Sequence, residues 1–250
     1  METESVIETQ NLTKMYNGQA AVDRLSFRVK KGEIFGFLGP NGAGKTTTLL
    51  MLLGLTEPTS GTARVLNLDP TRDPIKVKTK IGYLQENMGF YGDLNARQML
   101  QFIAELNGLA GKPADERIDR ALETVGLLDE ASKKIAFYSR GMRQRLGIAE
   151  LLIKDSKVAF LDEPTLGLDP DATNRMIELI QSLCRDKKIT VLLSSHLLHQ
   201  VQKICHRIGI MIKGRMVAQG PMDQLAKEKF GVGKDAYSLE EIYMKYFQEA

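Results

Sequence analysis

The sequence predicts an α/β protein with a mainly parallel sheet, an N-terminal antiparallel β subdomain and an inserted α-helical subdomain. Apolar, β-branched runs alternate with helical patterns, which is typical of parallel strands connected by covering helices. The runs are Ile34–Leu38, Ile81–Leu84, Val158–Leu161, Ile189–Leu193 and Ile208–Ile212. Two segments depart from this alternation. Residues 1–30 with Thr62–Leu68 predict short antiparallel strands, and residues 95–154 show helical patterns without a convincing strand.

The helical segment is expected to hold helices over Ala96–Leu106, Asp115–Val125 and Gly141–Ile153. Ser139 is the expected N-cap of the third helix. Its apolar face is formed by Met142, Leu146, Ala149 and Ile153. The start of a helix attracts anions, Gly141 leaves room for one, and Arg140 and Arg143 add positive charge.

Two further features lie near the C-terminus. Lys213–Gly214 separates two apolar runs and predicts a hairpin turn. The segment Met222–Ala250 predicts a short amphipathic helical tail.

Composition limits the range of functions. The chain has 250 residues and a net charge of +3, without the basic run of a nucleic-acid-binding arm, so we expect no nucleic-acid partner. Its longest apolar run, Leu49–Leu55, is shorter than the roughly 20 residues that span a bilayer. The acidic N-terminus is unlike a secretory signal, and Cys184 and Cys205 fit no disulfide or metal pattern. We therefore expect a cytoplasmic protein that reaches any membrane through a partner.

The strongest motif is GPNGAGKT, between an apolar run and a helical pattern. It fits the phosphate-binding loop, whose glycines let backbone N–H groups surround phosphate oxygens. Lys45 is expected to reach the β- and γ-phosphates, and the Thr46 hydroxyl to bind Mg²⁺. An ordinary glycine-rich turn is disfavoured by this strand–loop–helix context. The expected phosphate contacts are Gly39, Pro40, Asn41, Gly42, Ala43, Gly44, Lys45, Thr46 and Thr47.

A second motif, KVAFLDEPT, places two carboxylates after a buried strand. Asp162 is suited to hold Mg²⁺, and Glu163 to orient or deprotonate an attacking water. Asp-Glu-Pro alone is more often a turn. Together with the phosphate loop, however, it indicates hydrolysis of a nucleoside triphosphate.

With these motifs, the sequence resembles the ATP-binding subunit of an ABC transporter over roughly Val6–Gly220. The resemblance implies a P-loop NTPase core and an ABC ATPase domain over residues 1–220. Within that domain it implies a RecA-like core of about 1–88 and 155–220 and a helical subdomain of about 89–154. Residues 221–250 remain as the C-terminal helical tail.

The resemblance also assigns roles along the chain. It implies that Tyr16 stacks on adenine, that Gln85 senses Mg²⁺ and the γ-phosphate, and that His196 contacts the γ-phosphate. Leu168–Asp169 match the loop after the metal-binding strand. The implied catalytic residues are Lys45, Gln85, Glu163 and His196, and the implied metal ligands are Thr46, Gln85 and Asp162.

Several of these residues have simpler interpretations. Tyr16 could be a surface aromatic, Gln85 a solvent-facing strand end, and Asp169-Pro170 a plain turn. A zinc site can also be drawn, although its spacing fits no recognised pattern, and the γ-phosphate role of His196 is favoured over it. Its ligands would come from His196, His199, Cys205 and His206.

YSRGM, residues 138–142, matches the family's signature segment. The resemblance implies head-to-tail pairing of two subunits, with Ser139 and Gly141 of one closing over the γ-phosphate held by Lys45 of the other. A monomer would then bind ATP yet hydrolyse it poorly. The usual signature is LSGGQ, and here Tyr138, Arg140 and Met142 replace Leu, the first Gly and Gln.

The YSRGM form is similar to that of export-type transporters. It implies an ATP-hydrolysing subunit, peripheral on the cytoplasmic face of the membrane, with a separate permease docking near residues 86–102. Met88, Phe90 and Tyr91 are the apolar candidates there, although they could simply pack the helical segment. The alternatives are an importer ATPase, a soluble ABC ATPase and a silent ATP-binding module. The single cassette and the intact motifs favour the transporter ATPase, while the cargo stays open.

Overall fold

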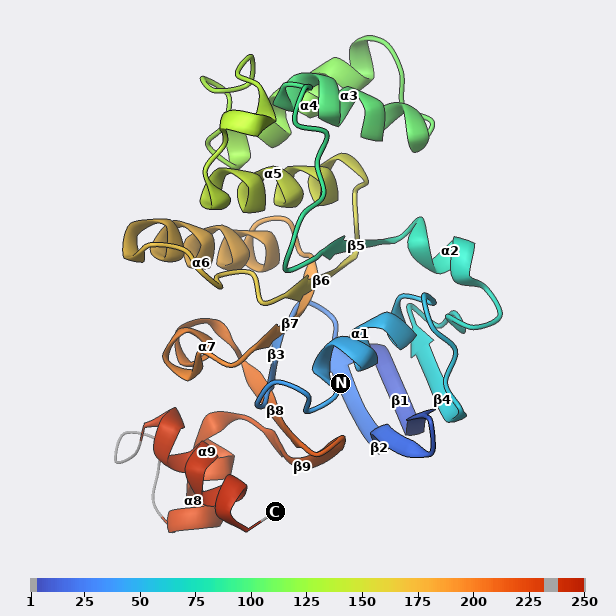
Figure 1. The fold of residues 1–250 in the computed structure, drawn as a ribbon, viewed down its shortest axis with the longest axis vertical. Helices are drawn as coiled ribbons and strands as arrows, with labels where there is room; N and C mark the ends of the chain where they lie inside the picture. Colours follow the sequence, from blue (N-terminus) through green and yellow to red (C-terminus); the bar gives the residue numbers. More distant parts are fainter. Residues whose placement is uncertain (1–3, 232–237, 250) are drawn as a thin grey trace.

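The computed structural model describes residues 4–231 and 238–249, which form two sheets and a separate group of helices (Figure 1). The first sheet has the order β2-β1-β4 and the second the order β5-β6-β7-β3-β8-β9. The strands are β1 Ser5–Tyr16, β2 Gln19–Lys30, β3 Ile34–Leu38, β4 Ser60–Val65, β5 Ile81–Leu84, β6 Val158–Asp162, β7 Thr190–Ser195, β8 Arg207–Ile212 and β9 Arg215–Gly220. The helices are α1 Lys45–Leu52, α2 Pro74–Lys78, α3 Ala96–Leu106, α4 Lys112–Thr124, η1 Ile135–Phe137, α5 Arg140–Ile153, α6 Pro170–Arg185, α7 Leu198–Ile204, α8 Met222–Phe230 and α9 Leu239–Gln248.

The six-stranded sheet confirms the predicted parallel architecture. All its pairings are parallel except β8 with β9. Every residue of β3, β6 and β7 is buried, which explains their nearly continuous apolar sequences. The predicted hairpin is present, and Lys213 and Gly214 both have positive φ, as a two-residue turn requires.

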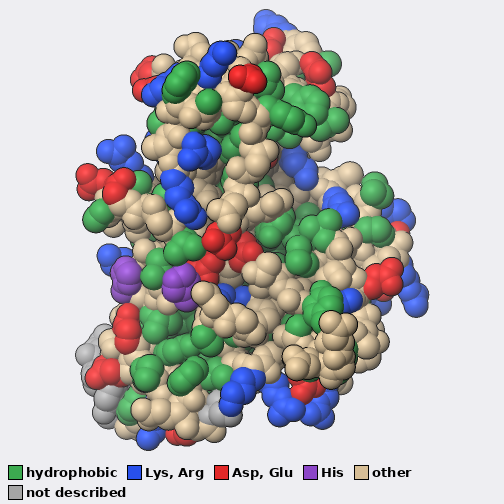
Figure 2. Space-filling view, in the orientation of Figure 1, with side chains coloured by type: hydrophobic (Ala, Val, Ile, Leu, Met, Phe, Trp, Pro, Cys, Tyr) green, Lys and Arg blue, Asp and Glu red, His purple; other side chains and the backbone are tan. Residues whose placement is uncertain are grey.

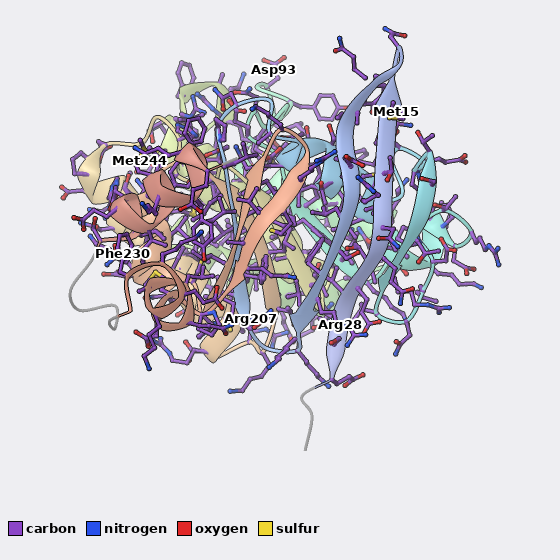
Figure 3. The ribbon with its side chains drawn as sticks, turned by 90° about the horizontal axis from the view of Figure 1, so that it is seen from below. Met15, Arg28, Asp93, Arg207, Phe230 and Met244 are labelled. Carbon is purple, nitrogen blue, oxygen red and sulfur yellow. The ribbon has the colours of Figure 1, made fainter. Side chains whose placement is uncertain are left out.

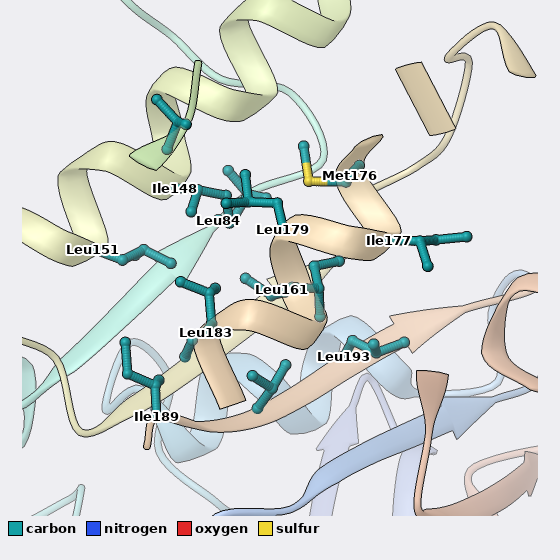
Figure 4. Packing of buried hydrophobic residues seen from close by; sticks show 14 of the residues in the cluster. Leu84, Ile148, Leu151, Leu161, Met176, Ile177, Leu179, Leu183, Ile189 and Leu193 are labelled. Atoms are coloured by element: carbon teal, nitrogen blue, oxygen red, sulfur yellow. The ribbon is translucent and has the colours of Figure 1, made fainter. Parts of the chain in front are cut away.

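Strand alternation divides the core in two. On one face, Phe35 and Phe37 pack with Phe27 of β2, at ring-centroid distances of 4.8 to 5.8 Å. On the other face, Leu161 and Leu193 pack beneath α6 and α5 (Figure 4). Because successive side chains of a strand point to opposite faces, one buried sheet holds the antiparallel layer and the helices together.

The antiparallel sheet is larger than predicted. β1 and β2 are 12 residues long, so the expectation of short strands was wrong. Met15 and Arg28 lie toward opposite ends of this sheet (Figure 3). The strand expected over Thr62–Leu68 instead spans Ser60–Val65, because Leu66 and Asn67 have positive φ and turn the chain.

The segment between β5 and β6 is helical, as predicted, with only an isolated bridge between Asn95 and Lys134. In α3, Asn95 and Gln98 form a reciprocal capping box. The second helix begins at Lys112, earlier than expected, with Pro113 in its first turn. Helices α3, α4 and α5 form one group at the top of Figure 1, and α5 runs beside α6.

The described part of the predicted C-terminal tail contains two helices, α8 and α9. Residues 232–237 and 250, which also belong to that prediction, lie outside the described residues. Leu225, Ile242 and Tyr246 are buried in the same core as α6. No helix among the described residues has the length and apolarity needed to cross a membrane.

Candidate active site

The site lies where the parallel strands end. In register, Leu38 of β3 faces Ser195 of β7, and Asp162 of β6 faces Ser194. Leu84 of β5 faces Leu161, which puts Gln85 at the same edge. The carboxyl edge of such a sheet is where α/β folds bind ligands. Acidic side chains with histidine beside them gather near the middle of one face of the molecule (Figure 2).

Two glycines of the loop at residues 39–46 lie where other backbone comes close. A Cβ on Gly39 would lie 2.3 Å from the carbonyl oxygen of Met211, and one on Gly44 would lie 2.4 Å from that of Ala21. Gly42 has a φ of 79°, with nothing within 4 Å of an added Cβ. The loop is therefore braced from behind and open in front, as a phosphate cradle must be.

Lys45 is held inside this loop. Its ammonium donates to the carbonyl oxygens of Gly39, at 2.8 Å, and Pro40, at 3.3 Å. It also lies 3.6 Å from Glu163 Oε1, and both side chains are buried. The cation that would bind phosphate is thus paired with the carboxylate that would activate water.

Glu163 has a second partner. Its Oε1 lies 3.0 Å from His196 Nδ1, and its backbone N–H donates to the Ser194 carbonyl at 3.1 Å. Glu163 has a φ of 49°, in the left-handed region that non-glycine residues rarely occupy. Such strain concentrates at functional sites. Lys45, Glu163 and His196 therefore form one connected group.

Thr46 and Asp162 form an oxygen-rich pair beside that group. The Thr46 hydroxyl donates to Asp162, with Oγ1 3.0 Å from Oδ2. One carboxylate and one hydroxyl fit Mg²⁺, which takes its other ligands from water and substrate phosphates. Burial, together with the nearby Asp162 charge, raises the pKa of the Tyr83 phenol to about 12.

Sequence reasoning missed two neighbours of this pair. The Ser194 hydroxyl donates to Asp162 Oδ1, and Tyr83 comes from the adjacent strand β5. The only available signal for Ser194 was its position two residues before His196 at the end of a predicted strand. Tyr83 carried no signal of its own.

The remaining predicted site residues are not members of the Lys45–Glu163–His196 group, although the Pro40 carbonyl accepts a hydrogen bond from Lys45. The Tyr16 ring, at the end of β1, is 46% exposed, with Lys14 Nζ 5.1 Å from its centroid. Gln85 is exposed. Asp169 caps α6 by accepting the Ala172 N–H at 2.8 Å. Pro40, Asn41, Ala43 and Thr47 lie in the phosphate loop or the first turn of α1.

The signature segment forms the start of α5. Ser139 is exposed and accepts the Met142 N–H at 3.2 Å, which confirms it as the N-cap. Gly141 is buried, and a Cβ there would lie 3.2 Å from the Ala172 Cβ of α6. In this chain, glycine at position 141 lets the starts of α5 and α6 pack together.

The residues considered for zinc do not converge. His206 Nδ1 accepts the Ile34 N–H at 2.9 Å, and Cys205 is packed beneath Gly36. Across residues 4–231 and 238–249, no group of three or more His, Cys, Asp or Glu is arranged to hold a metal ion.

Comparison with known proteins identifies the family. The family model described as ABC transporter matches residues 22–166, more than half of the chain. The chain belongs to the ABC transporter family. It is therefore an ABC ATPase, as predicted.

Relatives and solved structures agree with this assignment. The ABC ATPase is 43% identical over 223 residues to the bacitracin transport ATP-binding protein BcrA of Bacillus licheniformis, covering 89% of this chain and 72% of that one. It is 37% identical to the probable multidrug ABC transporter ATP-binding protein YbhF of Escherichia coli, covering 98% of this chain and 42% of YbhF.

Two solved structures match almost the whole chain. One is the ATP binding subunit of an ABC transporter, with a TM-score of 0.85, 28% identity and 97% and 99% of the two chains covered. The other is cbiO1 from Clostridium perfringens, part of the cbiONQ transporter complex, with a TM-score of 0.83, 26% identity and 99% and 100% covered. These matches confirm the P-loop NTPase fold.

Proposed function

We propose that this ABC ATPase hydrolyses ATP at the junction of two head-to-tail copies and thereby powers a membrane exporter. The observation that carries the proposal is the contact of Glu163 with both Lys45 and His196 at the edge of the sheet. A carboxylate, a phosphate-binding cation and a histidine in contact, beside a phosphate loop, are the groups that triphosphate hydrolysis requires.

Each residue has a distinct role. Lys45 exchanges Glu163 and the loop carbonyls for the β- and γ-phosphates, which the backbone of residues 39–47 surrounds. Glu163, released from Lys45, orients or deprotonates the attacking water, and His196 contacts the γ-phosphate. Thr46 and Asp162, with Gln85, would hold Mg²⁺, which neutralises phosphate charge when bound. Tyr16 stacks on adenine.

The second copy completes the site. Ser139 is exposed at the start of α5, where the helix dipole favours an anion, and it lies on the helical segment rather than on the phosphate loop. In the proposed dimer, Ser139 and Gly141 of one subunit approach the γ-phosphate in the other, with Asp169 nearby. The core of about 1–88 and 155–220 and the helical subdomain of about 89–154 then close together.

The variant Glu163→Gln tests this mechanism. We expect turnover to fall by at least about 100-fold, because the general base is lost. ATP binding should persist and trap a dimer, visible as an earlier peak in size-exclusion chromatography with ATP. Turnover of the unaltered protein should rise with the square of its concentration. A Glu163→Gln protein that hydrolyses ATP normally, or that elutes only as a monomer, contradicts the proposal.

Three observations support export through a separate permease on the cytoplasmic face. The YSRGM segment resembles the signature of export-type transporters, and the relatives include bacitracin transport and linearmycin resistance ATP-binding proteins. The segment 86–102 also carries an exposed aromatic pair, in which the rings of Tyr91 and Phe102 lie 6.2 Å apart, edge to face. Met88 and Phe90 pack against the core instead.

The aromatic pair is the proposed docking anchor, so Tyr91→Asp with Phe102→Asp should abolish co-purification of the permease from solubilised membranes. Ile75→Asp is the matched control, because Ile75 is also an exposed apolar residue but lies on α2. Retained co-purification of the double variant, or equal loss in the control, counts against docking at this segment.

A further inference from the structure

Three buried polar atoms without a hydrogen-bond partner belong to residues of a single pocket beside the start of α5. Within the described residues, the buried side-chain atoms that lack a partner are Arg140 Nε, Arg140 Nη2, Gln144 Oε1 and Ser156 Oγ. Arg140 and Gln144 line one pocket of about 210 Å³. Its other lining residues are Glu86, Asn87, Met88 and Arg143. Because an unpaired buried polar group costs about 1–3 kcal/mol, this concentration indicates a missing complement.

The two free donors of Arg140 belong to one edge of its guanidinium. Nε–H and Nη2–H point in parallel and match the two oxygens of a carboxylate or phosphate. The group is also held in place: a Cβ on Gly167 would lie 3.2 to 3.4 Å from Nη1, Cζ and Nε of Arg140. No carboxylate in the described part of the chain forms an ion pair with Arg140. The fork is therefore positioned and unfilled.

The charge and the size of the pocket favour a single carboxylate side chain as its ligand. Arg140 and Arg143 outnumber Glu86 by one positive charge, so one carboxylate would neutralise the pocket. Its volume is below the roughly 300 Å³ at which small-molecule sites begin, which suits a single side chain. The Gln144 carbonyl oxygen still needs a donor, since its amide nitrogen already donates to the Glu86 carbonyl at 3.0 Å. A polypeptide carries both a carboxylate and backbone N–H donors, whereas an anion without a proton, such as sulfate, carries only acceptors.

The position of the pocket selects the polypeptide. Glu86, Asn87 and Met88 begin the segment 86–102, whose exposed Tyr91 and Phe102 form the proposed permease anchor. We propose that an aspartate or glutamate side chain of the membrane subunit enters this pocket and is gripped by the Arg140 fork. This inference rests on the proposed function. It gives Arg140, which replaces a signature glycine, a role in partner recognition.

The test uses the full-length tagged ATPase and solubilised membranes of its source, from which the unaltered protein first identifies its membrane subunit. Arg140→Lys keeps the charge but loses the fork, and Asn87→Glu supplies a competing carboxylate from an exposed position. We expect each to reduce capture of that subunit about tenfold, the loss of one bidentate charged contact. Arg120→Lys on α4 and Asn87→Gln are the matched controls and should capture it normally.

A charge swap then identifies the contact. Arg140→Glu should lose capture and regain it when one cytosolic Asp or Glu of the membrane subunit is changed to Lys. Normal capture by both Arg140→Lys and Asn87→Glu, or failure of every swap, overturns the pocket while leaving the ATP-trapped Glu163→Gln dimer as separate support for the ATPase mechanism. Should Arg140→Lys prove unfolded by thermal melting, Asn87→Glu and its control decide. Absence of any captured membrane subunit overturns both this inference and permease coupling.

Discussion

The edge of the parallel sheet and the pocket at the start of α5 both contain charged side chains with buried atoms, but the hydrogen-bond and charge partners of these atoms differ. At the sheet edge, the Lys45 cation lies against Glu163, which also contacts His196, while Asp162 accepts from Thr46 and Ser194. At the pocket, Arg140 and Gln144 keep three buried atoms without partners.

The difference separates two ways of preparing a binding site. At the sheet edge, the charged side chains already have partners within the protein. A ligand must therefore replace these contacts with its own, and the protein is stable before the ligand binds. The pocket gains contacts only when something enters it. A ligand there would give hydrogen-bond partners to atoms that lack them, without breaking existing contacts. Such a site is suited to detecting the arrival of a partner.

The largest effect should come from breaking the complete site. Lys45→Met should reduce ATP turnover by at least about 100-fold, because the cation proposed to bind the phosphates is lost. It also leaves the buried Glu163 carboxylate without its cation, which should lower the free energy of unfolding by about 3 kcal/mol.

Chemical denaturation of the unaltered protein, Lys45→Met and the double variant measures the loss of unfolding free energy. Adding Glu163→Gln to Lys45→Met should restore much of the lost stability, because the unpaired charge disappears, while turnover stays low. If the two changes destabilise additively, Lys45 and Glu163 are not energetically coupled and the sheet edge is not self-neutralised.

A smaller effect on stability is expected from Glu150, in the C-terminal half of α5, the helix that begins at the Arg140 pocket. Burial raises the pKa of Glu150 to about 7, partly opposed by Lys154. This pKa lies above the ordinary value of 4.5. The stability that the neutral Glu150 side chain contributes is therefore fully present below about pH 4.5 and is lost as the pH rises through about 7. Glu150→Gln removes that loss and should be more stable than the unaltered protein at pH 8, on the order of 2 kcal/mol.

Urea unfolding at pH 5 and pH 8 measures this difference. The advantage of Glu150→Gln should be small at pH 5 and grow toward pH 8. An advantage of equal size at both pH values would show that Glu150 is not the titrating group.

The sequence predicted those parts of the molecule whose physics is local. The parallel strands were recognisable because burial on both faces makes them apolar, and the phosphate loop because its residues are consecutive. The length of β1 and β2 was not recognisable, because Asn11 and Arg24 with positive φ and several register shifts interrupt their alternation. Only the fold reveals the burial of α9 in the core.

The same distinction holds within the site. Asp162 and Glu163 follow one another in sequence and were predicted together. Ser194 reaches Asp162 through the parallel register of β6 and β7, which sequence does not specify. The Arg140 guanidinium packs against Gly167, which lies in the turn between β6 and α6, so no local sequence pattern could have predicted its unpaired atoms.

The smallest change in stability is expected at Arg140, and its comparison with Ser194 sets the two regions side by side. Ser194→Ala removes a partner from the buried Asp162 and should lower the free energy of unfolding of the isolated ATPase by about 1–3 kcal/mol. Arg140→Met removes donors that have no partner and replaces them with an apolar side chain of similar length, so stability should stay the same or rise by about 1 kcal/mol. Denaturant unfolding of both variants measures the two changes. A loss at Arg140 as large as that at Ser194 would mean that the Arg140 fork already has a partner in the free protein, and the distinction between a complete site and an unfilled one would fail.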